Sequence, residues 1–185
     1  MENVEVEVKL KIENPKKLLD WLSKHAKPLG TQRQVDYYFD HPHKSFAFVD
    51  ELGRKRADEY LRLRVDRKGA TLCFKRCREE SGSTYYDEIE AGTENPKNMR
   101  MILETLGFKE MLIIDKKRKS YRYKNFQFDC DQVTGLGFFV EVEYKGKVKS
   151  PKMCLKEIYD LLSEIGIKDY EEMNIGYLAM LWNKK

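Results

Sequence analysis

Charged residues occur two positions apart along segments that alternate charged and apolar residues. In the first such segment, Val4–Ile12, the residues Glu5, Glu7, Lys9 and Lys11 alternate with aliphatic residues. Side chains of a β-strand point alternately to its two faces, so these four charged residues are expected to share one face. Two carboxylates followed by two ammonium groups have the chemistry to bind a divalent cation at one end and a polyanion at the other. In a single strand, the solvated face of an amphipathic sheet gives the same pattern.

The same arrangement recurs in later strand-like segments. Its members are Arg62 and Arg64, Lys75, Glu88 and Glu90, Lys116 and Arg118, Asp129 and Asp131, and Glu141 and Glu143. If the sheet closes, these faces point inward, where charges need partners or a charged ligand because unpaired burial costs several kcal/mol each. Since Mg²⁺ binds carboxylates and phosphate oxygens, and Arg binds phosphate bidentately, the pattern favours a metal-bound polyphosphate ligand.

Length and composition favour a single folded domain spanning residues 1–185, with 36% charged and 41% hydrophobic residues. The net charge is only +4, from 35 basic and 31 acidic residues, so phosphate binding must depend on where the charges lie. No stretch approaches the ~18 apolar residues of a membrane span. The N-terminus is acidic and enters a strand at once, without the pattern of a secretory signal, so we expect a cytoplasmic protein with no membrane partner.

Other candidate sites are less well supported. The four cysteines, which lack Cys-x-x-Cys spacing, are expected to be free thiols: Cys73, Cys77, Cys130 and Cys154. His41 and His43 beside Asp40 are a possible metal site. Because they lie in an irregular loop without a further Cys/His cluster, we interpret them as ordinary loop residues. The basic runs 54–56 and 116–119 lack the stacking aromatic residues of an RNA-binding motif, so no nucleic-acid partner is predicted.

The remaining pattern predicts about eight strands and three or four helices. Helices are expected over 16–27, 96–106 and 152–165, the first after a capping Asn14 with Pro15 at the first helical position. Residues 41–58 are expected to form an irregular loop. The amphipathic segment 170–182 is a candidate subunit interface or barrel plug, although docking on its own chain is favoured. Many antiparallel strands with few helices predict an α+β fold whose sheet is curled or closed into a barrel.

Taken in order, the motifs resemble the CYTH domain, also called the triphosphate tunnel metalloenzymes. The residues that carry this resemblance are Glu5-x-Glu7-x-Lys9, Asp36-Tyr37-Tyr38-Phe39-Asp40, Leu61-Arg62-Leu63-Arg64, Thr71-Leu72-Cys73-Phe74-Lys75, the block from Asp131 to Glu143, and Gly176-Tyr177-Leu178-Ala179-Met180-Leu181. Each motif is weak alone, but together they cover almost the whole chain.

The resemblance implies a closed antiparallel eight-stranded β-barrel, with a polar charged interior that forms a triphosphate tunnel and helices packed outside. It implies that Mg²⁺ or Mn²⁺ is bound by an acidic set: Glu5, Glu7, Glu88, Glu90, Asp131, Glu141 and Glu143. It implies that the triphosphate is bound by a basic set: Lys9, Lys11, Arg62, Arg64, Lys75, Lys116 and Arg118. Lys9 and Lys116 are also the candidate catalytic residues, as general bases made possible by nearby cations that favour the neutral amine, with water alone as the alternative.

The family includes class IV adenylyl cyclases, thiamine triphosphatases and inorganic triphosphatases. The segment around Asp36 and the chain length are most similar to the cyclase branch, which converts ATP to cAMP and pyrophosphate. Alternatives are an inorganic or organic triphosphatase and a non-catalytic nucleotide- or polyphosphate-binding module. A homodimer is a candidate assembly. Two departures bear on substrate choice: Tyr86 stands where the family usually has Arg, and Arg76-Cys77 replaces a common Gly-Pro.

Overall fold

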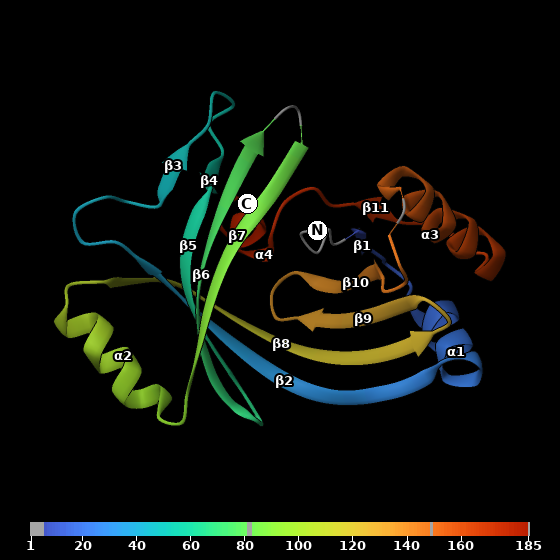
Figure 1. Ribbon diagram of the computed structural model, residues 1–185, viewed down its shortest axis with the longest axis horizontal. Coiled ribbons are helices and arrows are strands. Elements are labelled where there is room, and N and C mark those ends of the chain that lie inside the picture. Colours follow the sequence, from blue (N-terminus) through green and yellow to red (C-terminus); the bar gives the residue numbers. More distant parts are fainter. Residues whose placement is uncertain (1–5, 81–82, 149, 185) are drawn as a thin grey trace. The chain divides into compact units, whose positions relative to one another are not determined.

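The computed structural model describes residues 6–80, 83–148 and 150–184, and leaves out the side chains of 77–80 and 83–86. These residues form an α+β fold with four helices and eleven strands. Figure 1 labels them along the chain. The helices are α1 (Lys16–His25), α2 (Pro96–Thr105), α3 (Pro151–Ile165) and α4 (Tyr177–Trp182). The strands are β1 (Val6–Lys11), β2 (Lys27–Asp40), β3 (Ala47–Val49), β4 (Lys55–Ala57), β5 (Glu59–Asp66), β6 (Gly69–Glu80), β7 (Ser83–Thr93), β8 (Lys109–Tyr123), β9 (Phe126–Val133), β10 (Gly137–Tyr144) and β11 (Glu171–Glu172).

Nine of the strands form one sheet in the order β11-β1-β10-β9-β8-β2-β5-β6-β7, and β3 pairs with β4 separately. Neighbouring strands pair antiparallel, as in β1 with β10 and β5 with β6. The order has two ends, β11 and β7, and no pairing among the described residues joins them. The prediction of a large antiparallel sheet is confirmed, whereas the closure into an eight-stranded barrel is not established.

The chain divides into two compact units. Unit 1 comprises Met1–Gln32 and Lys116–Asn174, and unit 2 comprises Arg33–Asp115 and Ile175–Lys185. The two longest β-strands, β2 and β8, each contribute residues to both units. None of the helices in the described part of the chain is long and apolar enough to cross a bilayer.

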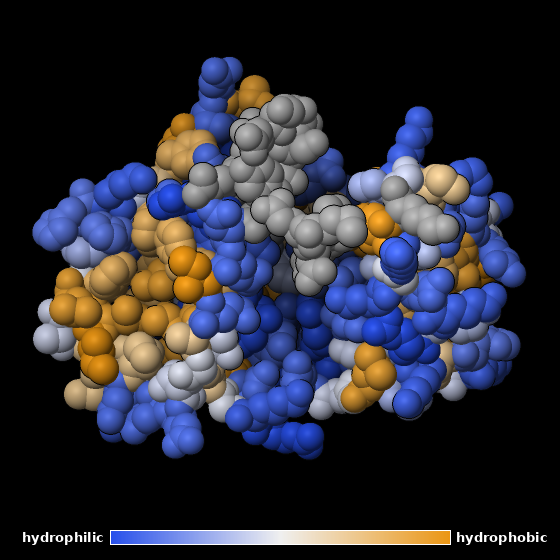
Figure 2. All heavy atoms as spheres, in the orientation of Figure 1, coloured by the Kyte–Doolittle hydropathy of each residue, from blue (hydrophilic) through white to orange (hydrophobic). Residues whose placement is uncertain are grey.

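Unit 2 has a small core in which α2 packs beside β2 and β5. Phe39 and Leu63 are fully buried, and Leu103 is the buried residue of α2. The helix begins where predicted, because the side chain of Asn95 accepts a hydrogen bond of 3.0 Å from the backbone N–H of Asn98. Most of the surface in Figure 2 is hydrophilic, but hydrophobic atoms gather over α2 at the left of the view.

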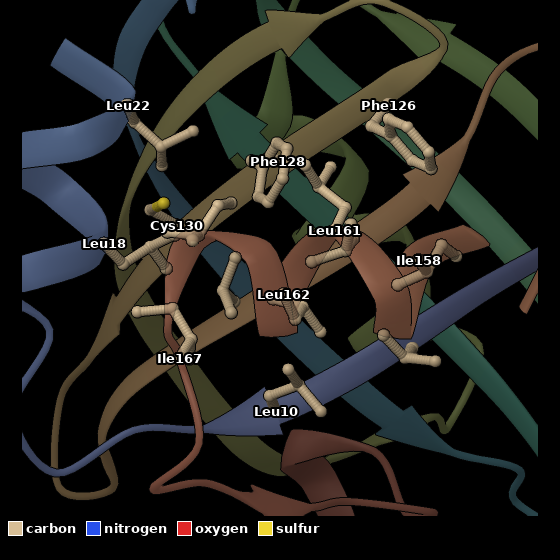
Figure 3. Close-up of a cluster of buried hydrophobic side chains, with 14 of the residues drawn as sticks. Leu10, Leu18, Leu22, Phe126, Phe128, Cys130, Ile158, Leu161, Leu162 and Ile167 are labelled. Atoms are coloured by element: carbon tan, nitrogen blue, oxygen red, sulfur yellow. The ribbon is translucent and has the colours of Figure 1, made fainter. Parts of the chain in front are cut away.

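Unit 1 has the larger core, in which α1 and α3 cover the apolar face of the sheet (Figure 3). Leu10 of β1 and Phe128 of β9 point to this face and are fully buried, as are Leu18 of α1 and Ile158 of α3. The helix α3 ends at Gly166, whose positive φ of 78° is a left-handed conformation that glycine adopts at little cost. The apolar half of the period-two pattern therefore forms the core, which leaves the charged half for the opposite face.

Three local expectations need correction. The segment 41–58 contains the hairpin β3–β4, whose turn forms around the Asp50 carboxylate as it accepts hydrogen bonds from the backbone N–H groups of Leu52 and Arg54. The N-cap of α1 is Pro15 rather than the expected Asn14. The Asn14 side chain accepts only a long hydrogen bond, of 3.4 Å, from the backbone N–H of Lys16. Residues 170–182 form β11 and α4 rather than one amphipathic segment.

The C-terminal helix α4 docks on its own unit, as favoured from the sequence. Tyr177, Leu178 and Met180 are buried, and the Lys55 ammonium lies 5.2 Å from the ring centroid of Trp182. The side-chain amide of Asn183 forms two hydrogen bonds of 2.8 Å with the backbone of Lys55. Its oxygen accepts from the Lys55 N–H, and its NH₂ group donates to the Lys55 carbonyl. The three buried side chains of this helix are therefore covered within the chain.

Replacing Leu162 with Ala tests the core of unit 1. Leu162 is 1% exposed, so the substitution should lower the free energy of unfolding by about 2–5 kcal/mol. Met153→Ala on the same helix, where the side chain is 64% exposed, should change it by less than about 0.5 kcal/mol. Urea denaturation followed by circular dichroism measures both, and equal effects of the two substitutions would contradict the assignment of this core.

Candidate functional site

The charged face of unit 1 is built from cross-strand rows. The registers of β1, β10, β9 and β8 place residues side by side in three rows: Glu7, Glu143, Gln127 and Arg122; Lys9, Glu141, Asp129 and Ser120; and Lys11, Phe139, Asp131 and Arg118. Side chains directly opposite in such rows lie close enough to interact. The doublets found in the sequence therefore form one charged surface opposite the core of α1 and α3, interrupted by the buried Phe139 between Lys11 and Asp131.

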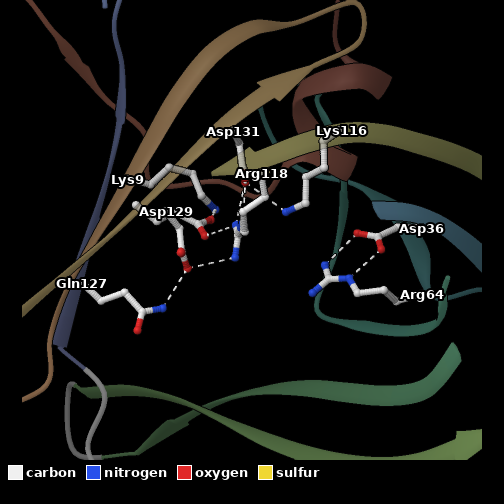
Figure 4. A network of polar contacts seen from close by, with 9 residues as sticks. Lys9, Asp36, Arg64, Lys116, Arg118, Gln127, Asp129 and Asp131 are labelled. Atoms are coloured by element: carbon white, nitrogen blue, oxygen red, sulfur yellow. Dashed lines mark hydrogen bonds and ion pairs between the residues drawn. The ribbon is translucent and has the colours of Figure 1, made fainter. Parts of the chain in front are cut away.

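Arg118 is the centre of this surface (Figure 4). Its guanidinium donates to both carboxylate oxygens of Asp131, at 2.7 and 2.6 Å, and to Glu141 at 2.6 Å. It also donates to Asp129 at 3.1 Å. Burial acts to lower the pKa of Arg118, but the hydrogen bonds to Asp131 and the charge of Glu141 raise it well above its ordinary value. Arg118 is therefore held cationic by three carboxylates.

Two lysines complete the network. The Lys116 ammonium, which is almost fully buried, donates to Asp131 at 3.0 Å. Lys9 forms an ion pair of 3.1 Å with Glu141. Burial acts to raise the pKa of Glu141, but the charges of Lys9 and Arg118 lower it far below its ordinary value, so this carboxyl is ionised.

The outer residues of the face are less constrained. Glu7 is exposed, and Lys11 lies 3.7 Å from Glu13. The Glu143 carboxylate is paired with Lys145. These predicted site residues lie on the charged face, and among the described residues the ion pairs of Lys11 and Glu143 are to neighbours outside the network around Arg118.

The two carboxylate oxygens of Asp129 differ in their contacts. Its Oδ2 accepts hydrogen bonds from Arg118 and from the Gln127 amide, at 3.1 and 3.2 Å. Its Oδ1 is buried and accepts no hydrogen bond among the described residues. A buried acceptor of this kind costs about 1–3 kcal/mol if it stays unpaired, so the site is suited to an additional cation or donor.

Unit 2 carries a second charged face with the same construction. The registers of β2, β5, β6 and β7 form three rows: Tyr60, Lys75 and Glu88; Tyr38, Arg62, Cys73 and Glu90; and Asp36, Arg64, Thr71 and Gly92. Here too, the apolar side chains of the same strands, such as Phe39 and Leu63, point to the core.

Arg64 and Asp36 form a bidentate pair, with Nε and Nη2 donating to the two carboxylate oxygens at 2.7 and 2.8 Å (Figure 4). Arg62, on the same face, is 12% exposed and lies 3.8 Å from Glu88. Burial acts to lower the pKa of Arg62, but Tyr38 and Asp36 raise it above its ordinary value. The Arg62 Nε is buried and has no hydrogen-bond partner in the described part of the chain. Arg62 thus has a buried N–H that is suited to an oxygen ligand.

Cys73, Glu88 and Glu90 offer ligand atoms that all lie within 4.8 Å of one another, as a divalent cation requires. The Cys73 thiol donates to Glu88 at 3.1 Å, and Lys75 donates to the other oxygen at 3.4 Å. Burial and the bond to Glu88 raise the pKa of Cys73 to about 12, so the thiol is protonated and acts as a donor. Burial acts to raise the pKa of Glu88, but Cys73 and Lys75 lower it below its ordinary value.

Most of the residues proposed from the sequence thus lie on two charged faces, one in each unit. Glu5 lies outside the described residues, as do the side chains of Tyr86 and Cys77. Cys73, Cys130 and Cys154 are free thiols, as expected. His41 is not part of a metal cluster in the described residues; its Nδ1 accepts hydrogen bonds from the backbone N–H groups of His43 and Lys44.

Sequence reasoning missed four residues of the faces as site residues: Asp36, Tyr38, Cys73 and Asp129. Asp129 lies two positions before Asp131, so the two side chains share one face of the strand. This spacing could have identified Asp129 as a site residue. Gln34, Asp36 and Tyr38 lie two positions apart in an aromatic segment, so the sequence indicates a polar face there as well.

Comparison with known proteins gives the same family over both units. The chain matches the CYTH domain over residues 3–177. A protein of Methanocaldococcus jannaschii named "Putative adenylate cyclase" is 29% identical over 179 residues, which cover 96% of this chain and 98% of that protein. A protein of solved structure from Pyrococcus horikoshii is 27% identical with a TM-score of 0.73, covering 96% of this chain and 98% of that one.

A solved protein from Vibrio parahaemolyticus, described as "a putative adenylate cyclase", has a TM-score of 0.65 over 96% of this chain and 97% of its own. At 16% identity, it supports the fold alone. The match over nearly the whole length, together with the two charged faces, shows that the chain belongs to the CYTH domain family.

Proposed function

We propose that this protein is a divalent-metal-dependent enzyme that acts on a triphosphate, of the class IV adenylyl cyclase type, converting ATP to cAMP and pyrophosphate. The observation that carries the proposal is the face around Arg118, where buried cations and carboxylates alternate and the Asp129 Oδ1 accepts no hydrogen bond from the residues that the structure describes. A solvated surface does not require such burial, whereas a site for a metal–polyphosphate complex needs charges of both signs.

The carboxylates fit a hard divalent cation such as Mg²⁺ or Mn²⁺, because both ions prefer oxygen ligands. In unit 1 the proposed ligands are Asp129 and Glu141, with Glu5, Glu7, Asp131 and Glu143 as further acidic groups. In unit 2 they are Glu88 and Glu90. When bound, the cation would neutralise phosphate charge and stabilise the charge that develops as the phosphoryl bond breaks.

The basic residues would bind the phosphates. Arg62 is the most suitable of them in unit 2, because its Nε is buried without a hydrogen-bond partner among the described residues and a phosphate oxygen could accept from it. We propose that the other basic residues of the two faces also donate to phosphate oxygens: Lys75 and Arg64 in unit 2, and Lys9, Lys11, Lys116 and Arg118 in unit 1. Oriented by these contacts, the 3′-hydroxyl of ATP attacks the α-phosphorus, the bond to the bridging oxygen breaks, and pyrophosphate leaves.

The proton of the 3′-hydroxyl needs an acceptor, for which Lys9 and Lys116 stay the candidates beside water. Both ammonium groups contact carboxylates, so binding of phosphate is the role that their surroundings favour. Closure of the sheet into the barrel that the family resemblance implies, as one domain over residues 1–185, is part of the same proposal. Hydrolysis of inorganic or organic triphosphates is the alternative activity, and non-catalytic binding is the alternative outside enzymes.

Product analysis separates these alternatives. ATP and inorganic triphosphate are each incubated with Mg²⁺ and with Mn²⁺, and cAMP, pyrophosphate and phosphate are resolved. We expect cAMP and pyrophosphate in equal amounts, lost with chelator. Phosphate without cAMP would identify the protein as a triphosphatase instead. Binding of triphosphate without any product, at all metal concentrations, would leave a binding module.

Single lysine substitutions test the two faces. Lys9→Ala in unit 1 and Lys75→Ala in unit 2 should each lower kcat/KM by about 10- to 100-fold, because a hydrogen bond to a charged group contributes about 1.5–3 kcal/mol. The matched controls are the exposed Lys119→Ala and Lys68→Ala, which keep the same net charge as the variants. Steady-state kinetics measure all four proteins. Equal losses in variants and controls would point to net charge rather than to these faces.

Asp129→Asn tests the proposed metal ligand with little structural change. The Asn side chain can keep its oxygen at the Oδ2 position, where it accepts from Arg118 and Gln127, and place the NH₂ group at the unpartnered Oδ1. We expect the metal concentration for half-maximal activity to rise at least about tenfold, since a charged ligand is lost. Asp160→Asn, on the exposed side of α3, should leave it unchanged. An unaltered metal dependence of Asp129→Asn would remove Asp129 from the site.

A further inference from the structure

The side-chain amide of Gln34 is a buried polar group on the charged face of unit 2. Gln34 lies in β2 two positions before Asp36, and alternation along the strand directs both side chains away from the core that contains Phe39. Gln34 is 4% exposed, and its Oε1 is buried and accepts no hydrogen bond from the described residues. Leaving such an acceptor unpaired is unfavourable, so the amide is suited to a ligand that brings a donor.

The row of residues next to Gln34 carries no net charge. Asp36 is almost fully buried, and both of its carboxylate oxygens accept hydrogen bonds from Arg64 (Figure 4). Farther along the same row lie Thr71 and Gly92. A Cβ added at Gly92 would meet no atom of the described residues within 4 Å, so there is open space over this position. This end of the face is therefore polar but neutral, which suits an uncharged organic group better than a polyphosphate.

The groups suited to phosphate lie in the other rows of this face. Arg62, whose buried Nε has no hydrogen-bond partner in the described part of the chain, lies in the row of Tyr38, and Lys75 lies one row farther. Four positions of β2 separate Tyr38 from Gln34, which is about 13 Å at the ordinary rise of a strand. A ligand with its phosphates at Arg62 and Lys75 therefore meets Gln34 only with a part that extends beyond them.

We propose that Gln34 recognises the nucleoside part of the substrate, with its Oε1 accepting a hydrogen bond from the base or the ribose while the triphosphate binds at Arg62 and Lys75. This inference rests on the function proposed above and narrows its substrate to a nucleoside triphosphate. The donors of the nucleoside part of ATP are the amino group of adenine and the two ribose hydroxyls. Fully ionised inorganic triphosphate has no donor, and a site with a buried polar group discriminates against a ligand that leaves this group unpaired.

Binding measurements on the full chain test this role of Gln34. Isothermal titration calorimetry with Mg²⁺ compares inorganic triphosphate with α,β-methylene-ATP, in which carbon replaces the oxygen of the bond that cyclisation breaks. Gln34→Met keeps the length of the side chain and removes the amide. It should weaken binding of the nucleotide about 3- to 10-fold and change binding of inorganic triphosphate less than about twofold. Gln132→Met, at an exposed position of β9, is the matched control and should alter neither.

Folding of the variants is checked by circular dichroism. Replacing an unpaired buried acceptor by an apolar group of similar shape should not lower the stability. If Gln34→Met does not fold, Gln34→Leu provides the same comparison.

Analogues of the same nucleotide that lack the adenine amino group, the 2′-hydroxyl or the 3′-hydroxyl identify the donor. The analogue without the contacted group should bind the wild type more weakly and should be insensitive to Gln34→Met, as a double-mutant cycle requires. Equal losses for nucleotide and inorganic triphosphate, no loss for either, or additive effects with all three analogues would overturn the role of Gln34 and leave the proposed function in place. A wild type that binds neither ligand would overturn both.

Discussion

The buried contacts of Arg118 are the interaction on which the architecture of unit 1 depends. A guanidinium at this depth is stable only when its carboxylate partners are in place, and removing one partner of such a group costs about 3–5 kcal/mol. Its partners Asp131 and Asp129 come from β9, and Glu141 comes from β10. A slip of one residue in any of these strands would move a charge into the hydrophobic core, so the network and the core specify the same register.

The same constraint explains why the charged faces are built on strands rather than on loops. Each strand must bury Leu, Val or Phe side chains on one face, and this burial fixes the direction of the intervening Arg, Lys, Asp and Glu side chains. In unit 2, the burial of Leu63 between the two arginines of β5 positions Arg64 for its bidentate contact with Asp36. Packing on one side of the sheet thus preorganises charges on the other, which loops could not do as rigidly.

The period-two pattern therefore predicted the elements and the faces well, because it reports which side of a strand is buried. The pattern did not identify which side chains the charged residues contact. Asp36 was missed as a site residue because its contact with Arg64 depends on the pairing of β2 with β5, across a segment that contains the β3–β4 hairpin. Cys73 was predicted only as a free thiol, since its contact with Glu88 requires the register of β6 against β7. The pattern could not distinguish an open sheet from a closed one either, because alternation is identical in both.

Pairing of the cations with carboxylates has a consequence for the proposed function. The Glu141 carboxylate is paired with both Lys9 and Arg118. A phosphate that took the donors of Arg118 would leave Asp131 and Glu141 with fewer partners in a poorly hydrated place, and this opposes binding of the polyanion alone. A divalent cation that took the released carboxylates would remove that cost. Metal and triphosphate should then bind with positive coupling, since each supplies the charge that the other leaves unpaired. Under the proposed function, the carboxylates would thereby discriminate against a polyanion without its metal, which a purely basic surface would bind readily.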